Sequence, residues 1–287
     1  MLGTSFVFAS NFSSSGAGVG TPFLLKDRIL FGGWDYATGY ELYSSDGTIA
    51  GTKLVKDVFP GQGQQFANSG FGGDLTRMGL GSVAVYHGLD GVVGNEAWVT
   101  DGTFGGTYSI TDFVADPLSI YGGVTAFTQV GGLVFCVNND GIHGLELYVI
   151  PVEKAGAAWA EKAGSGCPGT GASIAALNAV GAPTLGNSGF ACRMSGARPN
   201  AACVLEVSAA RSPVAIGGGC TLYVALPTIG VSGITDAAGV QVEALPIPNT
   251  TSLLGGSLWL QTAILDPAGA WFGIASFSDA LWVLIGK

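Results

Sequence analysis

The sequence predicts an all-β protein, and three observations support this fold class. Glycine accounts for 48 of the 287 residues, and only 11% of the residues are charged. Runs of Thr, Ser, Val and Leu alternate with glycine-rich stretches, which is typical of short strands joined by tight turns. One segment also recurs along the first half of the chain, at intervals of 55 and 50 residues. With 48% hydrophobic residues, a chain of this length can bury two cores.

The recurring segment is complete in two copies. "YELYSSDGTIAGTKLVKD" occupies residues 40–57, and "NEAWVTDGTFGGTYSITD" occupies residues 95–112. A third copy keeps only the first part, D-x-x-x-G-x-E followed by an aliphatic and an aromatic residue. The positions shared by all three copies are the aspartates Asp35, Asp90 and Asp140, the glutamates Glu41, Glu96 and Glu146, and the aromatic residues Tyr43, Trp98 and Tyr148. This spacing indicates a repeat protein.

Each unit contains up to four β-rich runs. In the first unit these are "PFLLK", "RILFGGW", the Glu-Leu-Tyr segment and "KLVKDV". Four short strands at a period of about fifty residues are typical of a propeller blade. We therefore expect a partial array of about three propeller-like blades over residues 1–160. A β-sandwich made of hairpins is the alternative.

The unit resembles the ELW-x-x-DGT-x-x-GT repeat, also described as hyalin-like, that occurs in arrays in large secreted bacterial proteins. The resemblance covers roughly residues 20–150, and the first two copies carry the whole motif. The third copy has lost D-G-T and the strand after it, as a terminal repeat does. The resemblance implies a propeller-like scaffold and does not imply a reaction.

The D-G-T motif predicts a tight turn, and the strand before it carries the candidate site residues. Asp46 and Asp101 can bond to their own backbone, while Gly47 and Gly102 can take positive φ. Alternation along the strand places the repeated glutamate and the repeated aromatic residue on one face. The glutamates are therefore structural hydrogen-bonding groups, solvated acids, or a ring of carboxylates for Ca²⁺, which prefers oxygen ligands. The candidate metal-binding aspartates are Asp35, Asp90 and Asp140, and the candidate glycan-binding residues are Tyr43, Trp98, Tyr148, Glu41, Glu96 and Glu146. Core packing is the other interpretation of the three aromatic residues.

A change of composition predicts a second domain over residues 161–287. The Ala/Gly-rich stretch 153–171 separates the repeats from a region without the fifty-residue period. This region resembles a C-terminal β-sandwich module of large secreted bacterial proteins, through "GSGCPG", "GAPTLGN", "GCTLYV", "DAAG", "LPIPN" and "LWLQTAILDP". The resemblance implies display, anchoring or sorting at the cell exterior, with no catalytic residues to assign.

Four of the five cysteines lie in the second domain and predict two disulfides, as in an exported protein. "FACRMSGARPNAACVLEV" reads as a hairpin about Gly196–Pro199, which places Cys192 opposite Cys203 at disulfide range. Cys167 then pairs with Cys220. Metal binding is the rival interpretation, but this half of the chain has no C-x-x-C and no histidine. Cys136 is expected to be a buried free thiol.

The charge pattern excludes several partners. The net charge is −9, and residues 1–160 contain fourteen acids against six bases. With no basic stripe to neutralise phosphates, nucleic acid is not an expected partner. No apolar run approaches the roughly 18 residues of a membrane span. The first residues lack a basic start and an apolar core, so they do not form a recognisable signal peptide. We expect a secreted or cell-surface protein whose export signal was removed or lies before Met1.

Motifs of catalysis are missing from the sequence. It contains no G-x-S-x-G, no H-E-x-x-H and no phosphate-binding glycine motif followed by a helix. His87 and His143, the two histidines, are expected to be polar residues that flank the repeat turn. Three function classes follow: an extracellular binding or adhesion module for glycans, a self-assembling structural surface protein, and a hydrolase of polysaccharide or polyester with unrecognised carboxylates or a Ser-His pair.

Three blades are too few to close a propeller, which typically needs four to eight. The segment "SFVFAS" near the N-terminus could supply the strand that the third unit lacks, within one chain or in a neighbouring chain. Open strand edges favour pairing with another chain. We therefore expect a homo-oligomer, or else a fragment of a longer array in which Met1 is an internal start.

Overall fold

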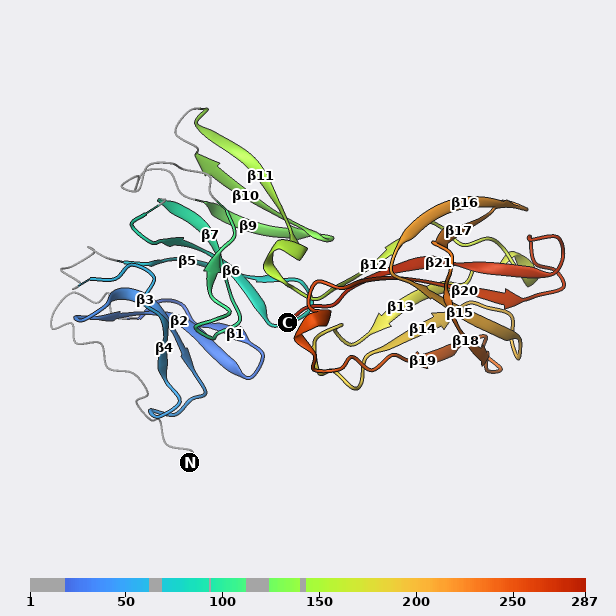
Figure 1. Ribbon diagram of the computed structural model, residues 1–287, viewed down its shortest axis with the longest axis horizontal. Helices are drawn as coiled ribbons and strands as arrows, with labels where there is room; N and C mark the ends of the chain where they lie inside the picture. Colours follow the sequence, from blue (N-terminus) through green and yellow to red (C-terminus); the bar gives the residue numbers. More distant parts are fainter. Residues whose placement is uncertain (1–18, 62–68, 93, 112–123, 140–142) are drawn as a thin grey trace. The chain divides into compact units, whose positions relative to one another are not determined.

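A computed structural model describes residues 19–61, 69–92, 94–111, 124–139 and 143–287 of the protein (Figure 1). The described chain is all-β, as predicted, and its few helical segments are single 3₁₀ turns. It divides into two compact units, residues 1–155 and 156–287, which are described separately below. None of the helical segments among the described residues has the length and apolarity that crossing a bilayer requires.

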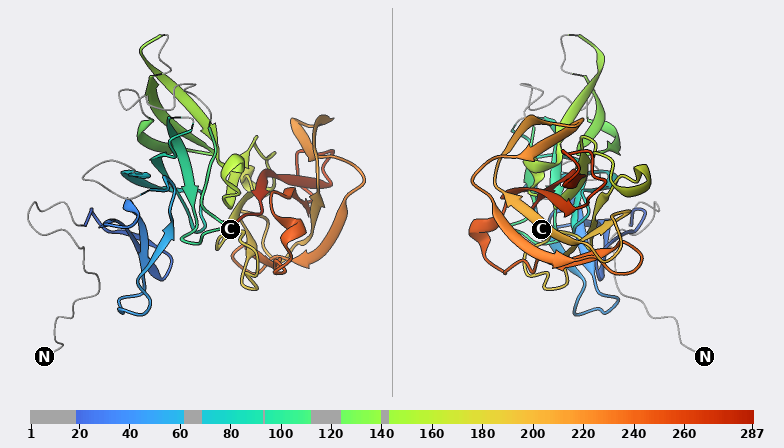
Figure 2. Two further views of the ribbon diagram at one scale, coloured as in Figure 1. Left: turned by 60° about the vertical axis from the view of Figure 1, so that its left-hand side comes forward. Right: turned by 90° about the vertical axis from the view of Figure 1, so that its right-hand side faces the viewer.

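The first unit contains three antiparallel sheets that follow one another along the chain, coloured blue, teal and green in Figure 2. Each sheet is a meander, with neighbouring strands paired in sequence order. The first sheet contains β1 (Phe23–Leu25), β2 (Arg28–Asp35), β3 (Gly39–Ser45) and β4 (Lys53–Lys56). The second contains β5 (Phe71–Met78), β6 (Val83–Leu89), β7 (Asn95–Thr100) and β8 (Tyr108–Ser109). The third contains β9 (Thr125–Val130), β10 (Leu133–Asn139) and β11 (Leu145–Pro151).

The sheets coincide with the repeats, and the four expected strands form in the first two. Each sheet has a glutamate face, which carries Glu41, Glu96 or Glu146, and an aliphatic face on its other side, which carries Leu42, Ala97 or Leu147. The aliphatic face of the first sheet packs on the glutamate face of the second, since Leu42 shares a core cluster with Tyr86 and Trp98.

The third sheet has three strands, so the described residues contain no counterpart of β4 or β8 there. Strand β9 contacts β5 and β6 and thereby covers the second sheet. After β11 the chain enters a 3₁₀ turn, η1 (Val152–Ala155), in place of a D-G-T turn. The segment "SFVFAS", considered above as a source of the missing strand, lies outside the described residues.

The second unit is also built of antiparallel sheets (Figure 1). The largest has the order β12-β21-β20-β15-β18, a second has the order β13-β14-β19, and a third pairs β16 with β17. The bounds of these strands are β12 (Trp159–Ala163), β13 (Ala176–Val180), β14 (Ala191–Ser195), β15 (Ala202–Ser208), β16 (Arg211–Gly217), β17 (Cys220–Val224), β18 (Ile229–Ile234), β19 (Gln241–Ala244), β20 (Ser257–Leu265) and β21 (Ala275–Leu284). Two 3₁₀ turns, η2 (Thr170–Ala172) and η3 (Thr251–Leu253), complete the unit.

Side chains from both larger sheets meet in one core. Leu177 and Met194 come from the three-stranded sheet, while Leu205, Leu260 and Leu281 come from the five-stranded sheet. Each is nearly inaccessible to solvent. Burial on this scale stabilises the fold, at roughly 1.5–3 kcal/mol for each such side chain.

The Ala/Gly-rich stretch 153–171 is not only a linker, in contrast to the prediction. Its residues Trp159–Ala163 form β12, an edge strand paired antiparallel with β21 over five residue pairs from Trp159↔Leu284 to Ala163↔Ala280. The second unit comprises residues 156–287 and includes this strand. The prediction relied on composition alone, and an edge strand needs only one hydrogen-bonded neighbour.

One of the two predicted disulfides is present. Cys167 and Cys220 are bonded, with a Cα–Cα distance of 4.9 Å. Cys192 and Cys203 are buried free thiols, and so is Cys136, as expected. The hairpin prediction that paired Cys192 with Cys203 is wrong, because β14 and β15 belong to different sheets.

Hydrogen bonding explains why that hairpin does not form. Residues 196–201 connect the two strands, but their amides do not bond back across a turn. The N–H groups of Ala197 and Asn200 donate to the carbonyls of Gly239 and Asp236. A segment that is distant in sequence thereby satisfies the hydrogen bonding of these two amides, and β15 pairs in the other sheet.

Candidate functional site

The repeated D-G-T-x-x-G-T motif forms a turn that is closed by its own side chains. In the first copy Asp46 Oδ1 accepts hydrogen bonds from the Thr48 amide at 3.0 Å and the Thr48 hydroxyl at 2.7 Å. Thr48 Oγ1 accepts from the Gly51 amide at 2.9 Å, and the hydroxyls of Ser45 and Thr52 lie 2.7 Å apart. Gly47 has a φ of 90°, as predicted.

The second copy repeats this turn almost atom for atom. Asp101 Oδ1 accepts from the Thr103 amide at 3.0 Å and its hydroxyl at 2.6 Å, and Thr103 Oγ1 accepts from the Gly106 amide at 3.1 Å. Gly102 has a φ of 82°. Hydrogen bonding to Thr48 lowers the pKa of Asp46. The motif is thus a structural turn, and its aspartates are already engaged within it.

Glu41, on the first sheet, forms hydrogen bonds with the segment that follows this sheet in the chain. Its carboxylate is buried, and Oε1 accepts from the Gly70 amide at 2.9 Å and the Phe59 amide at 3.2 Å. Burial raises the pKa of Glu41 to about 8, against the effect of these hydrogen bonds, and the charge of Asp57 raises it further. The carboxyl is therefore neutral over much of the physiological range, and its role here is to hold the connection between two sheets.

The other two glutamates occupy different environments. Glu96 is buried, and its Oε2 accepts from the Thr111 hydroxyl at 2.6 Å, just after β8. Thr111 Oγ1 in turn accepts from the Ala97 amide at 2.8 Å. Glu146 is exposed. The three glutamates thus do not present one ring of carboxylates: two hold the exits of their own sheets, and the third lies at the surface.

The predicted aromatic platforms are not surface features in the first two repeats. Tyr43 and Trp98 are buried at 8% and 6% exposure, and Tyr148 is half-buried. Tyr43 stacks on Phe31 with ring centroids 6.0 Å apart. The burial of Tyr43 and Trp98 leaves no broad face on which a sugar ring could stack, so these two are core residues.

The predicted aspartates serve turns as well. Asp35 Oδ1 accepts from the Ala37 amide at 2.7 Å, and Asp90 Oδ1 accepts from the Val92 amide at 2.8 Å. Asp140 lies outside the described residues. Within the described part of the chain, no group of three or more His, Cys, Asp or Glu side chains could hold a metal ion.

The two histidines lie in different environments. His87 lies within β6, not at a turn, and packs on Gly72, where an added Cβ would meet its ring at 1.8 Å. Its Nδ1 is 3.8 Å from Asp74 Oδ2, beyond hydrogen-bonding range. Burial lowers the pKa of His87, and Asp74 partly opposes this. His143 is exposed and precedes β11.

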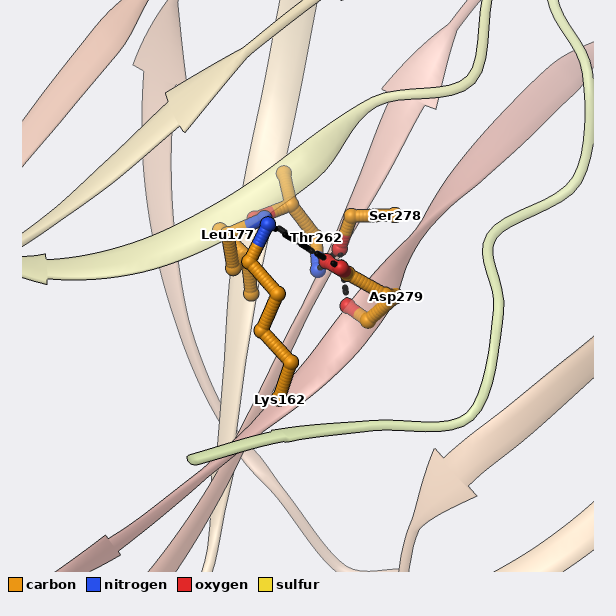
Figure 3. Close-up of polar contacts among 5 residues, drawn as sticks. All are labelled: Lys162, Leu177, Thr262, Ser278 and Asp279. Carbon is orange, nitrogen blue, oxygen red and sulfur yellow. Dashed lines mark hydrogen bonds and ion pairs between the residues drawn. The ribbon is translucent and has the colours of Figure 1, made fainter. Parts of the chain in front are cut away.

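A buried polar cluster in the second unit joins its two larger sheets (Figure 3). Asp279 on β21 accepts from the Leu177 amide of β13 at 2.7 Å and lies 3.7 Å from Lys162 Nζ on β12. Ser278 Oγ donates to the Asp279 carbonyl at 2.6 Å and accepts from the Thr262 amide at 2.9 Å. Burial raises the pKa of Asp279, while Leu177 and Lys162 oppose this. Because the serine hydroxyl is fully engaged, the cluster is a structural tie and not a nucleophilic site.

Among the residues that the structure describes, a pocket in the first unit is a candidate binding site. It has a volume of about 380 Å³ and lies between the first sheet and the D-G-T turn of the second repeat. Its walls come from the β1–β2 turn, from β2, β3 and β4, from Ser82 ahead of β6, and from residues 101–104. This volume is at the lower end of the range for ligand pockets, roughly 300–1,000 Å³. We call it the junction pocket.

The chemistry of the junction pocket differs from that of the rest of the unit. Lys26, Arg28 and Lys53 line it, together with the carboxylates Asp27 and Asp101. These are three of the six bases among residues 1–160. The hydroxyl of Ser82 is buried in the wall and has no hydrogen-bond partner among the described residues.

Phe104 provides an exposed aromatic ring at the same pocket, with 69% of its surface accessible. Lys56 Nζ lies 5.1 Å from the centre of this ring and 5.5 Å from the centre of the Trp98 ring, within cation–π range. The same ammonium donates to the Thr107 carbonyl at 2.7 Å. The pocket thus combines an apolar platform with charged groups of both signs.

The sequence does not predict the junction pocket, because the D-G-T turn of the second repeat lines it together with residues of the first repeat that belong to no motif. Lys26, Arg28 and Lys53 come from two separate strands and a turn, and Phe104 occupies a variable position of the D-G-T-x-x-G-T motif, where the first repeat has Ile49. The available signal was the clustering of lysine and arginine in an acidic region, at residues 26–28 and 53–56.

Comparisons with protein-family models, with curated proteins and with solved structures found no match to this chain.

Proposed function

We propose that this chain is a binding or adhesion module of the cell exterior that recognises a glycan through the junction pocket. The observation that carries the proposal is the exposed ring of Phe104 beside a pocket lined by charged groups. Sugar rings present apolar C–H faces and hydroxyl groups, which an aromatic ring and charged hydrogen-bonding side chains complement. The Cys167–Cys220 disulfide supports an exported setting.

The proposal includes the architecture expected from the sequence. The three successive sheets are propeller-like blades of an array that resembles the ELW-x-x-DGT-x-x-GT repeats, and the second unit is a β-sandwich module. The meander order of each sheet supports the first assignment, and the shared core of two sheets supports the second. In this arrangement the array displays the pocket, and the second unit anchors or sorts the protein.

Binding to immobilised polysaccharides tests the proposed function, with Phe104→Ala as the diagnostic variant. We expect the variant to lose affinity by about tenfold or more, as substitution of a central aromatic contact does. Ile49→Ala is the matched control, because Ile49 is 74% exposed and holds the same position in the first repeat's turn. A full-length protein that binds no polysaccharide, or a Phe104→Ala variant that binds like the control, would contradict the proposal.

A second candidate function, self-assembly, is favoured by the third sheet. Leu42 and Ala97 on the aliphatic faces of the first two sheets are fully buried, whereas the equivalent Leu147 is 69% exposed. Leu145 and Val149 extend the exposed strip along β11. In the first sheet the equivalent face is covered by the sheet of the next repeat, so a second copy of this chain, which carries the same kind of sheet, is the occupant that we propose. Light scattering at increasing protein concentration tests this homo-oligomer.

A further inference from the structure

We propose that the junction pocket binds an anionic sugar unit, so that the ligand is an acidic polysaccharide bearing carboxylate or sulfate groups. This inference rests on the proposed glycan-binding function and narrows its ligand class. The chain has a net charge of −9 and eleven bases, yet three of those bases line one pocket of about 380 Å³ and Lys56 lies at its aromatic wall.

The positions of the cations fit an anion that enters from solvent. Lys26 and Lys53 are exposed, and Arg28 is half-buried. The β1–β2 turn contributes Lys26, the start of β2 contributes Arg28 and the start of β4 contributes Lys53. Arginine offers a planar set of donors that matches a carboxylate or sulfate, and lysine adds a mobile point charge.

The two carboxylates in the wall leave this preference intact. Asp101 is committed to its own turn, where it accepts both hydrogen bonds from Thr103. Three cations and two carboxylates line the pocket, so its lining carries one net positive charge in a negatively charged unit. Arg28 also interacts with Asp46, which is outside the lining, so Lys26 and Lys53 are the main groups for an incoming anion. Asp27 can accept hydrogen bonds from sugar hydroxyls, and the buried Ser82 hydroxyl adds a polar group without a partner among the described residues. A sugar that carries both hydroxyls and an anionic group can bind Asp27 and Ser82 through its hydroxyls and the cations through its anionic group.

The test measures binding of the full-length chain to a polyuronate, to dextran sulfate and to neutral dextran over a range of salt concentrations. We expect binding to one or both acidic polymers, weakening as salt rises, and no binding to neutral dextran. Lys53→Gln should weaken binding by about fivefold, and the double change Arg28→Gln with Lys53→Gln by about tenfold or more. The two acidic polymers separate carboxylate from sulfate recognition.

Lys154→Gln is the control. This substitution removes the same charge, and Lys154 is exposed in the same unit but does not line the pocket. Equal losses in Lys53→Gln and Lys154→Gln would overturn the inference, as would binding to single-stranded DNA as tight as to the polyuronate. Binding to neutral dextran that depends on Phe104 but not on Lys53 would overturn the anionic assignment and leave the proposed function standing. Binding to no polysaccharide would remove both.

Discussion

The carboxylate of Asp101 lies directly against Gly106, so that a Cβ added to that glycine would come within 1.9 Å of Asp101 Oδ1. Gly51 has the same relationship to Asp46 in the first repeat, also at 1.9 Å. The second glycine of D-G-T-x-x-G-T is therefore required by a close approach and not by its backbone angles. A side chain here would displace the aspartate that organises the turn.

Gly106→Ala should consequently destabilise the first unit by about 1–3 kcal/mol, the usual effect of overpacking. The adjacent Gly105→Ala is a precise control, since an added Cβ at Gly105 meets nothing within 4 Å. We expect that variant to lie within about 0.5 kcal/mol of the wild type. Urea unfolding monitored by tryptophan fluorescence measures both, and equal stability of the two variants would contradict the close approach.

Glu41 predicts a pH dependence of stability. The folded chain holds its proton up to a pKa of about 8, whereas the ordinary value is 4.5. Its favourable contribution is therefore complete below about pH 4.5 and is lost as the pH rises through 8, with a slope of up to roughly 1.4 kcal/mol per pH unit. Glu41→Gln stays neutral and should flatten the unfolding free energy over this window.

Glu146→Gln is the control for this measurement, because Glu146 is the equivalent residue of the third repeat and is exposed. We expect it to leave the pH profile unchanged. Asp57, whose pKa burial also raises, retains a smaller slope in both variants. If Glu41→Gln and Glu146→Gln gave the same profile, Glu41 would not be the buried group that titrates.

The cysteines make a prediction about covalent structure. A non-reduced digest should contain one linked peptide pair, Cys167 with Cys220, and alkylation after unfolding should label Cys136, Cys192 and Cys203. Mass mapping checks both points. A peptide that joins Cys192 to Cys203 would show that the two strands approach each other more closely than the structure places them.

Removing the bond should destabilise the second unit. The cysteines are separated by 53 residues, and closing a loop of that length in the unfolded chain corresponds to about 4 kcal/mol in the chain-entropy account. We expect a loss of about 2–4 kcal/mol in Cys167→Ala with Cys220→Ala. Calorimetry measures it, and Cys136→Ala controls for the loss of a buried sulfur in the other unit. An unchanged second transition would contradict the assignment.

The aliphatic strip of the third sheet predicts how the chain associates. Leu147→Lys places a charge on the exposed face of β11 and should shift the assembly to a monomer of 28.9 kDa. Ile49→Lys adds the same charge at another exposed aliphatic position and should leave the assembly unchanged. Light scattering reports the mass, and a wild-type protein that stays monomeric at high concentration would end the self-assembly proposal.

The parts of the fold that the sequence predicted correctly are those decided by local chemistry. Asp46 and Gly47 form the expected turn because the aspartate bonds to the residue two positions further along the chain and the glycine takes positive φ. The strands of the first two repeats follow the same logic, since alternation and turn residues are both local signals. The all-β class and the repeat boundaries could therefore be predicted.

The incorrect predictions depended on long-range neighbours. Cys192 and Cys203 flank a short connection whose sequence is typical of a hairpin turn. The amides of this connection instead donate hydrogen bonds to the carbonyls of Asp236 and Gly239, and the two strands belong to different sheets. Alternation placed Glu41 and Tyr43 on one face but could not show that this face is covered. The junction pocket lies between a turn of one repeat and the sheet of another, so its lining residues do not recur with the period of the repeat.

The glutamates of the first two repeats have a consequence for how such a chain arises. Each of Glu41 and Glu96 secures the segment that follows its own sheet, through Gly70 and Thr111 respectively. A gene duplication of about fifty codons thus copies a sheet together with its own fastening.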